Sequence, residues 1–171
     1  LKPQGDRTSQ LIVRGKVRGT LAAARWREGR EGLLVDVLDS FARLSATCDQ
    51  IIVEGAGSPA EINLRAGDIA NLGFARAADV PVILVGDLNV APLPNDVWSH
   101  KQLLDVVSHT PVETELLGAV KNAFDWIDVT REFVPHEEKI YSWWSYRAQN
   151  WEASEGGSRL AHIWTTPGLR G

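Results

Sequence analysis

The sequence lacks several features that would assign it to familiar classes of protein. It has a single cysteine, Cys48, among 171 residues, which excludes an internal disulfide and a zinc site made of several cysteines. No apolar run reaches the roughly 18 residues of a membrane span, and no basic stretch followed by an apolar one opens the chain. We therefore expect a cytoplasmic protein with no membrane partner.

Methionine is absent as well, and the chain begins at Leu1, so we expect a fragment or a processed product. The rest of the composition changes near the middle. Residues 1–87 contain one tryptophan, no tyrosine and no histidine, whereas residues 88–171 contain six tryptophans, both tyrosines and all four histidines. The second part has 7 basic and 11 acidic residues, and this net negative charge disfavours a broad DNA-binding surface. A local, metal-assisted site remains compatible with it.

Apolar periodicity in the first part predicts strands that alternate with helices. Residues 50–54 and 81–85 are short, nearly continuous apolar stretches, typical of buried parallel strands. Residues 29–48 and 68–78 have the apolar spacing of helices, and residues 10–17 alternate loosely as a further strand. Because a helix separates the two buried stretches, the sequence predicts a right-handed parallel βαβ unit.

The second part has a different texture. Residues 111–124 have helical periodicity, and residues 126–129, 140–146 and 159–165 are rich in the aromatic and β-branched residues of strands. The expected fold class is therefore α/β. We predict a layered sandwich with the parallel βαβ unit in the amino-terminal half, joined to a mixed sheet in the carboxy-terminal half.

Glu54 stands where the first buried strand ends and a glycine-rich turn, Gly55-Ala-Gly57, begins. Ligands of α/β proteins bind at that edge of the sheet, and a carboxylate there can hold Mg²⁺ beside a phosphate. The turn also fits the loose dinucleotide pattern G-x-G-x-x-A, but the acidic residue that this pattern requires lies too far on, at Asp87. We expect Glu54 to be either a metal ligand or a solvated strand end.

The longer string around Glu54 is more specific. Residues 1–87, and above all IIVEGAGSPAEINLRAGDIANLGFARAADVPVILVGD, resemble the synthetase domain of cobyric acid synthase. The resemblance implies a P-loop-type domain that uses ATP, Mg²⁺ and glutamine-derived ammonia to amidate a corrinoid. Glu54 would then be a Mg²⁺ ligand, with Glu61, Asn63 and Asp68 near the substrate or phosphate. The family's G-x-x-x-x-G-K-[ST] loop and glutamine-hydrolysing domain are absent, so ATP is expected only if this interpretation holds.

A second resemblance begins where the first ends. The strings VGDLNVAPLPNDVWSHKQLLDVVSHTP, YSWWSYRAQNW and RLAHIW, within residues 86–171, resemble exonuclease III, the abasic-site endonuclease of the endonuclease/exonuclease/phosphatase superfamily. It implies half of a two-sheet sandwich and Mg²⁺-dependent hydrolysis of DNA phosphodiesters. Asp87 would bind metal and activate water, Asn89 would orient the water and His162 would contact the phosphate. The residues implied to bind an extruded abasic sugar are Trp143, Trp144 and Tyr146, whose alternative role is sheet core.

This part also departs from its family. The family places an aspartate directly before the last histidine, whereas this chain has Ala161. The family's amino-terminal half, with a metal-binding glutamate, an asparagine and a catalytic tyrosine, has no counterpart here. We therefore expect reduced activity or none.

The two resemblances meet at Val85-Gly86-Asp87, which both families place after a buried strand. We predict a segment of residues 1–87 and a segment of residues 88–171, which form two domains or merge into one. If the two buried strands are neighbours, Glu54 and Asp87 face one crevice and share a Mg²⁺. Three functions stay open: a weakened DNA-repair nuclease, a fragment of an ATP-dependent cobyric acid synthase of cobalamin biosynthesis, and a non-catalytic recombinant or assembly artefact. The sequence does not fix the oligomeric state.

Overall fold

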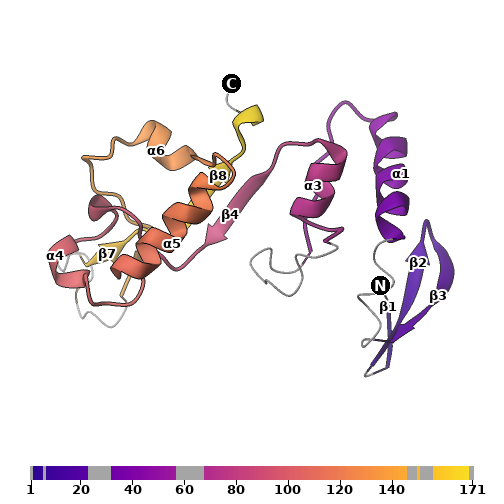
Figure 1. Ribbon diagram of the computed structural model, residues 1–171, viewed down its shortest axis with the longest axis horizontal. Coiled ribbons are helices and arrows are strands. Elements are labelled where there is room, and N and C mark those ends of the chain that lie inside the picture. Colours follow the sequence, from indigo (N-terminus) through magenta and orange to yellow (C-terminus); the bar gives the residue numbers. More distant parts are fainter. Residues whose placement is uncertain are drawn as a thin grey trace. The chain divides into compact units, whose positions relative to one another are not determined.

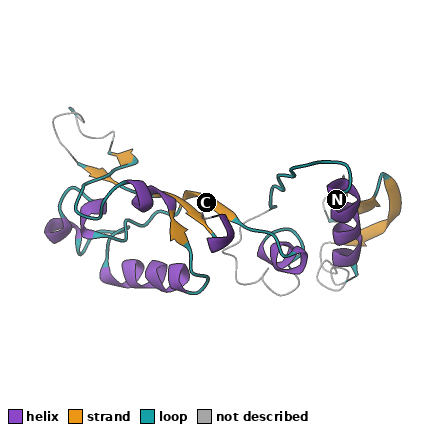
Figure 2. Ribbon diagram, turned by 90° about the horizontal axis from the view of Figure 1, so that it is seen from above, coloured by secondary structure: helices purple, strands orange, loops and turns teal. Residues whose placement is uncertain are grey.

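The computed structural model describes residues 2–5, 7–22, 32–56, 68–145, 150 and 156–169. The chain divides into two compact units, Leu1–Val80 and Pro81–Gly171, whose elements are labelled in Figure 1. Each unit contains helices and small antiparallel sheets (Figure 2), so the coarse prediction of a chain that mixes both is confirmed. Within the described ranges, no helix is long and apolar enough to cross a membrane.

Unit 1 opens with a three-stranded antiparallel sheet in the order β1 (Lys2–Gly5), β2 (Thr8–Val13), β3 (Lys16–Ala22). The single strand predicted at residues 10–17 is instead a hairpin. Its turn is Arg14-Gly15, where both residues have positive φ angles of 50° and 76°. A two-residue turn with two positive φ angles suits the right-handed twist of the flanking strands, and glycine adopts this conformation without strain.

Two helices complete the described part of unit 1. Helix α1 (Leu33–Ser45) and helix α3 (Leu72–Ala78) lie within the helices predicted at 29–48 and 68–78. They meet through the rings of Phe41 and Phe74, whose centroids are 5.3 Å apart in an edge-to-face arrangement. Ion pairs from Arg14 to Asp39 and from Arg18 to Asp36 connect the sheet to α1.

The parallel βαβ unit predicted for the first segment is not confirmed. Residues 51–56 form no strand in the part of the chain that the structure describes. Strand β4 (Ile83–Asp87), predicted as the second parallel strand, pairs antiparallel with β8 (Ala161–Thr165). The partner of β4 thus comes from the end of the chain, and the main chain at residues 51–54 is left without a partner strand among the described residues.

Unit 2 is built around that pairing. Its main sheet has the order β4-β8-β5, with β8 in the middle, and a second sheet pairs β6 with β7. Both sheets are antiparallel, so the mixed sheet predicted for this half is not found among the described residues. The other elements of unit 2 are η2 (Pro94–Asp96), α4 (His100–Leu103), α5 (Pro111–Asn122), β5 (Ile127–Asp128), α6 (Val129–Phe133), β6 (Trp143–Trp144), β7 (Gly157–Ser158) and η3 (Pro167–Leu169).

The main sheet is covered on one face and open on the other. Because successive side chains of a strand point to opposite faces, His162 and Trp164 of β8 are buried while Ala161 and Ile163 are exposed. On β4, Ile83 and Val85 share the open face with Ile163. In place of the predicted layered sandwich, the described residues of unit 2 form a main sheet whose second face is apolar and exposed.

The centre of unit 2 is a network of buried charges. Arg159, only 1% exposed, donates from Nε and Nη2 to the carboxylate of Asp96 at 2.8 and 3.0 Å, and from Nη2 to Asp128 at 2.8 Å. Arg131 donates from Nη2 to Asp96 at 2.5 Å. Two positive and two negative side chains therefore balance one another away from water. Burial lowers the pKa of Arg159, but the hydrogen bonds and charges of Asp96 and Asp128 outweigh it, so the pKa is raised.

Asp96→Asn should destabilise unit 2 by about 3–5 kcal/mol, because two buried guanidinium groups would share one remaining carboxylate. Urea unfolding followed by tryptophan fluorescence measures this, since six of the seven tryptophans lie in residues 88–171. The matched control is Arg43→Ala, which removes an exposed ion pair with Asp39 in unit 1 and should cost no more than about 1 kcal/mol. Equal small effects of the two changes would contradict the role of the network.

Candidate nuclease-type site

Asp87 and Asn89 lie together in a tight turn at the end of β4. The backbone N–H of Asn89 donates to Oδ1 of Asp87 at 2.7 Å, the pattern of an Asx turn. Asn89 has φ of 55°, in the left-handed region that asparagine tolerates better than most residues. Both side chains are exposed, so the turn presents a carboxylate and an amide to solvent at one end of the sheet.

Ala161 lies directly across the ladder from Asp87. The register pairs Asp87 with Ala161 and Gly86 with His162, and the N–H of Leu88 donates to the carbonyl of Leu160 at 2.9 Å. Directly opposite residues have Cβ atoms about 4.5–5.5 Å apart on the same face. The position where the exonuclease III resemblance expects an aspartate is therefore the nearest cross-strand neighbour of Asp87.

His162 points to the other face of the sheet. It is 2% exposed, and its Nε2 lies 2.8 Å from the carbonyl oxygen of Val90, so that nitrogen carries the proton and donates. Its Nδ1 is buried without a partner among the described residues, and its ring packs edge-to-face on Trp164. The structure thus brings Asp87 and Asn89 together and places the His162 side chain on the opposite face of the sheet from Asp87, and the joint catalytic role of the three residues stays a prediction.

Trp143 and Trp144 form β6 and are both partly exposed, so neither is a core residue. Trp144 packs edge-to-face against Tyr141, and a side chain at Gly157, its partner on β7, would collide with the Tyr141 ring. Ser142, the residue before Trp143, accepts hydrogen bonds through Oγ from the backbone N–H groups of Leu160 and Ala161, at 3.0 and 2.9 Å. Ser142 therefore ties the aromatic segment to the strand end that faces Asp87. Tyr146 lies outside the described residues.

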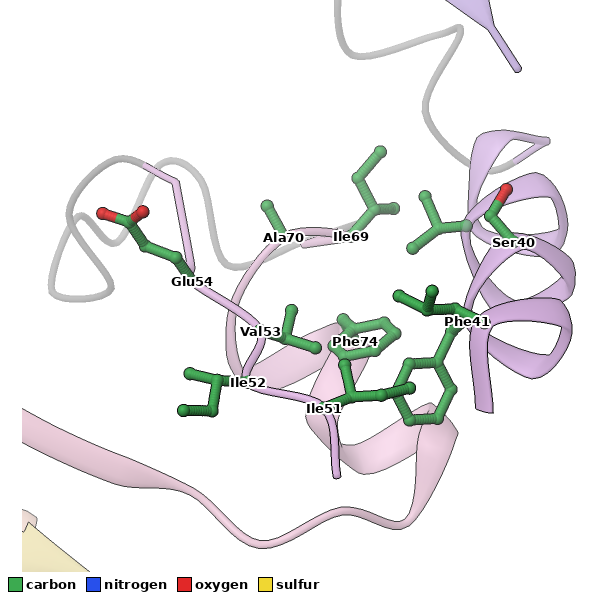
Figure 3. A pocket seen from close by; sticks show the side chains of 11 residues that line it. Ser40, Phe41, Ile51, Ile52, Val53, Glu54, Ile69, Ala70 and Phe74 are labelled. Carbon is green, nitrogen blue, oxygen red and sulfur yellow. The ribbon is translucent and has the colours of Figure 1, made fainter. Parts of the chain in front are cut away.

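Of the four site residues predicted for the first segment, the structure describes Glu54 and Asp68. Glu54 is exposed at the rim of an apolar groove of about 440 Å³ in unit 1 (Figure 3). Asp68 already accepts three backbone N–H groups, from Ala70, Asn71 and Gly73, at the start of α3. Its carboxylate therefore caps that helix. Glu61 and Asn63 lie outside the described residues.

A Mg²⁺ shared by Glu54 and Asp87 stays a prediction. The two residues belong to different units, and residues 51–54 form no strand in the described chain. Among those residues, no group of three or more histidine, cysteine, aspartate or glutamate side chains is arranged to hold a metal. Mg²⁺ is commonly held by one or two carboxylates, several waters and substrate phosphate. Asp87 with Asn89 fits only a weak site of that kind.

Curated relatives match the chain over part of its length. The cobyric acid synthase of Sphingopyxis alaskensis is 72% identical over 89 residues, which are 52% of this chain and 18% of that protein. The cobyric acid synthase of Novosphingobium aromaticivorans is 54% identical over 125 residues, 72% of this chain and 24% of that protein. The longer match extends beyond Asp87, so the boundary at residue 87 stays a prediction. No family model matches the chain.

The solved structures that are similar to part of the chain all have TM-scores below 0.5. An AP endonuclease from Archaeoglobus fulgidus is 28% identical, covers 53% of this chain and 35% of its own, and has a TM-score of 0.49. The 3′ phosphatase NExo from Neisseria, bound to a product DNA hairpin, is 24% identical with a TM-score of 0.47, over 52% of this chain and 34% of its own. The resemblance to cobyric acid synthase is confirmed over part of the chain, which spans only about a fifth to a quarter of these synthases. The resemblance to exonuclease III stays a prediction.

Sequence reasoning missed two buried polar groups of unit 2. One is the charge network of Asp96, Asp128, Arg131 and Arg159, whose members come from three separate stretches of the sequence and form no motif. The other is a histidine pair: buried His109 donates from Nδ1 to the carbonyl of Ala91 at 2.6 Å, and its Nε2 lies 2.8 Å from Nδ1 of His100. Only its tertiary contacts distinguish His109 from a histidine of a surface loop.

Burial also predicts a pH effect at His162. Desolvation is the largest cause that lowers the pKa of His162 below its ordinary 6.5, and the charge of Arg159 acts in the same direction. Below about pH 6.5, His162 therefore takes up a proton more readily in the unfolded chain than in the folded chain. The free energy of unfolding is unaffected by this group above about pH 6.5 and decreases as the pH drops below that value, by at most about 1.4 kcal/mol per pH unit. His162→Gln should flatten this part of the curve, measured as urea midpoints between pH 7.5 and 5. An unchanged slope would contradict the assignment.

Proposed function

We propose that unit 2 is the carboxy-terminal part of a Mg²⁺-dependent phosphodiesterase of exonuclease III type, with activity on DNA reduced to a trace. The observation that carries the proposal is the exposed Asp87–Asn89 turn at the end of β4, directly opposite position 161 of β8. The partly exposed Trp143 and Trp144, tied to the same strand end through Ser142, support a nearby surface for an unstacked sugar or base.

The residues divide the chemistry in a simple way. Asp87 would take the proton of an attacking water, while the Asn89 amide would orient that water toward the phosphorus. Bound Mg²⁺ would neutralise charge on the phosphate. Two parts are missing: Ala161 supplies no second carboxylate, and His162 faces the opposite side of the sheet and donates to Val90. A site to which the described residues contribute one carboxylate and no second catalytic group supports trace hydrolysis at most.

Cleavage of an abasic-site DNA duplex with Mg²⁺ should therefore run close to the uncatalysed rate. Any residual rate should disappear in Asp87→Ala, because the change removes the carboxylate that takes the proton from water. The same rate should survive His162→Gln, because that ring lies on the other face of the sheet. Cleavage that depends on His162 and not on Asp87 would overturn the site.

Ala161→Asp should raise Mg²⁺ affinity by at least about tenfold, because a second carboxylate would stand directly across from Asp87. Isothermal titration with Mg²⁺ measures the change. The matched control is Ile163→Asp, which adds a carboxylate to the same face opposite Val85 rather than opposite Asp87. Glu54→Ala, in unit 1, should leave the affinity unchanged. A gain of equal size in Ile163→Asp would show that bulk charge, not the cross-strand pair, is responsible.

A second function is favoured by sequence identity. The 72% identity over 89 residues supports the proposal that unit 1 is a piece of an ATP-dependent, amide-forming cobyric acid synthase of cobalamin biosynthesis. The G-x-x-x-x-G-K-[ST] loop that would cradle the phosphates of ATP is absent from the sequence. We expect no binding of Mg²⁺–ATP by the full chain at millimolar nucleotide, measured by equilibrium dialysis. Saturable binding would show that another segment replaces the loop.

A further inference from the structure

Two histidines of unit 2 meet through their ring nitrogens. Nδ1 of His100, the first residue of α4, lies 2.8 Å from Nε2 of His109. The ring centroids are 5.0 Å apart, and the ring planes cross at 81°. His100 is exposed, whereas His109 is buried. One imidazole of the pair is therefore fixed in the interior of unit 2, and the other connects it to solvent.

The tautomer of His109 follows from its second contact. Its Nδ1 lies 2.6 Å from the carbonyl oxygen of Ala91, and because a carbonyl can only accept, Nδ1 carries the proton. In the neutral ring, Nε2 then presents a lone pair toward His100. Histidines that bind metals commonly have this arrangement, in which the second ring nitrogen donates to a backbone carbonyl that fixes the orientation of the ring. His109 is therefore oriented as a metal ligand would be.

The separation of the two nitrogens suits a shared ion. Two nitrogens that each lie about 2.0–2.1 Å from one ion are about 2.8–3.0 Å apart when the angle at the ion is 90°, and about 3.3–3.4 Å apart when it is tetrahedral. The observed 2.8 Å fits the 90° angle of a tetragonal or octahedral ion such as Ni²⁺ or Cu²⁺. The exposed ring of His100 has to turn until its lone pair converges with that of His109, and its proton moves from Nδ1 to Nε2 by exchange with water.

We propose that His100 and His109 form a binding site for a divalent transition-metal ion that prefers imidazole ligands. The two ring nitrogens occupy adjacent positions around the ion. Water completes the shell, because the described residues include no group of three or more histidine, cysteine, aspartate or glutamate side chains arranged for a metal. Glu113 adds negative charge nearby. Its pKa is lowered chiefly by the hydroxyl of Thr110, and the charge of His109 is a smaller cause in the same direction.

The inference is independent of both proposed functions. Mg²⁺ takes oxygen ligands, so the imidazole pair selects a different class of ion from the turn that contains Asp87 and Asn89. Neither DNA nor ATP enters the test. Failure of the nuclease assays would leave the inference unaffected, and Asp87→Ala should leave the affinity of the histidine pair for its ion unchanged.

The test is isothermal titration of the full 171-residue chain, free of any affinity tag, with Ni²⁺ in millimolar Mg²⁺. We expect saturable binding of one Ni²⁺ per chain. His100→Asn should weaken this binding at least about tenfold, because Ni²⁺ prefers imidazole to an amide. The asparagine amide can still donate to Nε2 of His109, so a hydrogen bond with a purely structural role would survive the change. Ni²⁺ should also raise the urea midpoint of the wild-type chain and leave that of His100→Asn nearly unchanged.

Two control variants make each outcome decisive. His136→Asn removes an exposed histidine outside the pair, and Cys48→Ser removes an exposed thiol of unit 1. Each should change the Ni²⁺ affinity less than about twofold, because neither residue belongs to the site. Absence of saturable Ni²⁺ binding, or equal binding by His100→Asn, would overturn the proposal. A loss of binding in either control as large as that in His100→Asn would overturn it in favour of a different site.

Discussion

The organisation of unit 2 depends on Arg159 and the two aspartates it binds. Its guanidinium group bridges Asp96 of η2 and Asp128 of β5, and its own backbone N–H donates to the carbonyl of Asp96 at 2.7 Å. Arg159 lies two residues before β8, so the network fixes where that strand begins. A buried charge is tolerated only with full pairing, and the bidentate geometry leaves little freedom in the position of the strand that follows.

That constraint determines what faces Asp87. Once β8 starts at Ala161, the ladder with β4 places Asp87 opposite Ala161 and Gly86 opposite His162. Alternation along the strand then assigns Ala161 to the open face and His162 to the buried one. A shift of one residue would exchange these faces and expose His162 beside Asp87, but it would also move the Arg159 guanidinium away from Asp96 and Asp128. The charge network therefore opposes assembly of the trio that the sequence suggested.

Local features of both units were predictable from the sequence, whereas strand pairing was not. Helices α1 and α5 follow from apolar spacing, and the start of α5 carries a visible capping box, since Glu113 accepts from the Thr110 hydroxyl at 2.6 Å. The hydrogen bond from the Thr110 hydroxyl is the largest cause of the lowered pKa of Glu113. By contrast, Ile83–Val85 has the same apolar pattern in a parallel or an antiparallel sheet. Antiparallel pairing of β4 depends on β8, about 80 residues further along the chain, and no local sequence pattern predicts that partner.

The same ambiguity explains why β4 fits both resemblances. The short apolar stretch followed by Gly86-Asp87 belongs to the sequence strings that carry both resemblances. The structure assigns β4 to unit 2, with the unit boundary at Val80 and Pro81. Residues 51–54 then have no neighbouring strand in the described chain, although their side chains would suit the middle of a sheet.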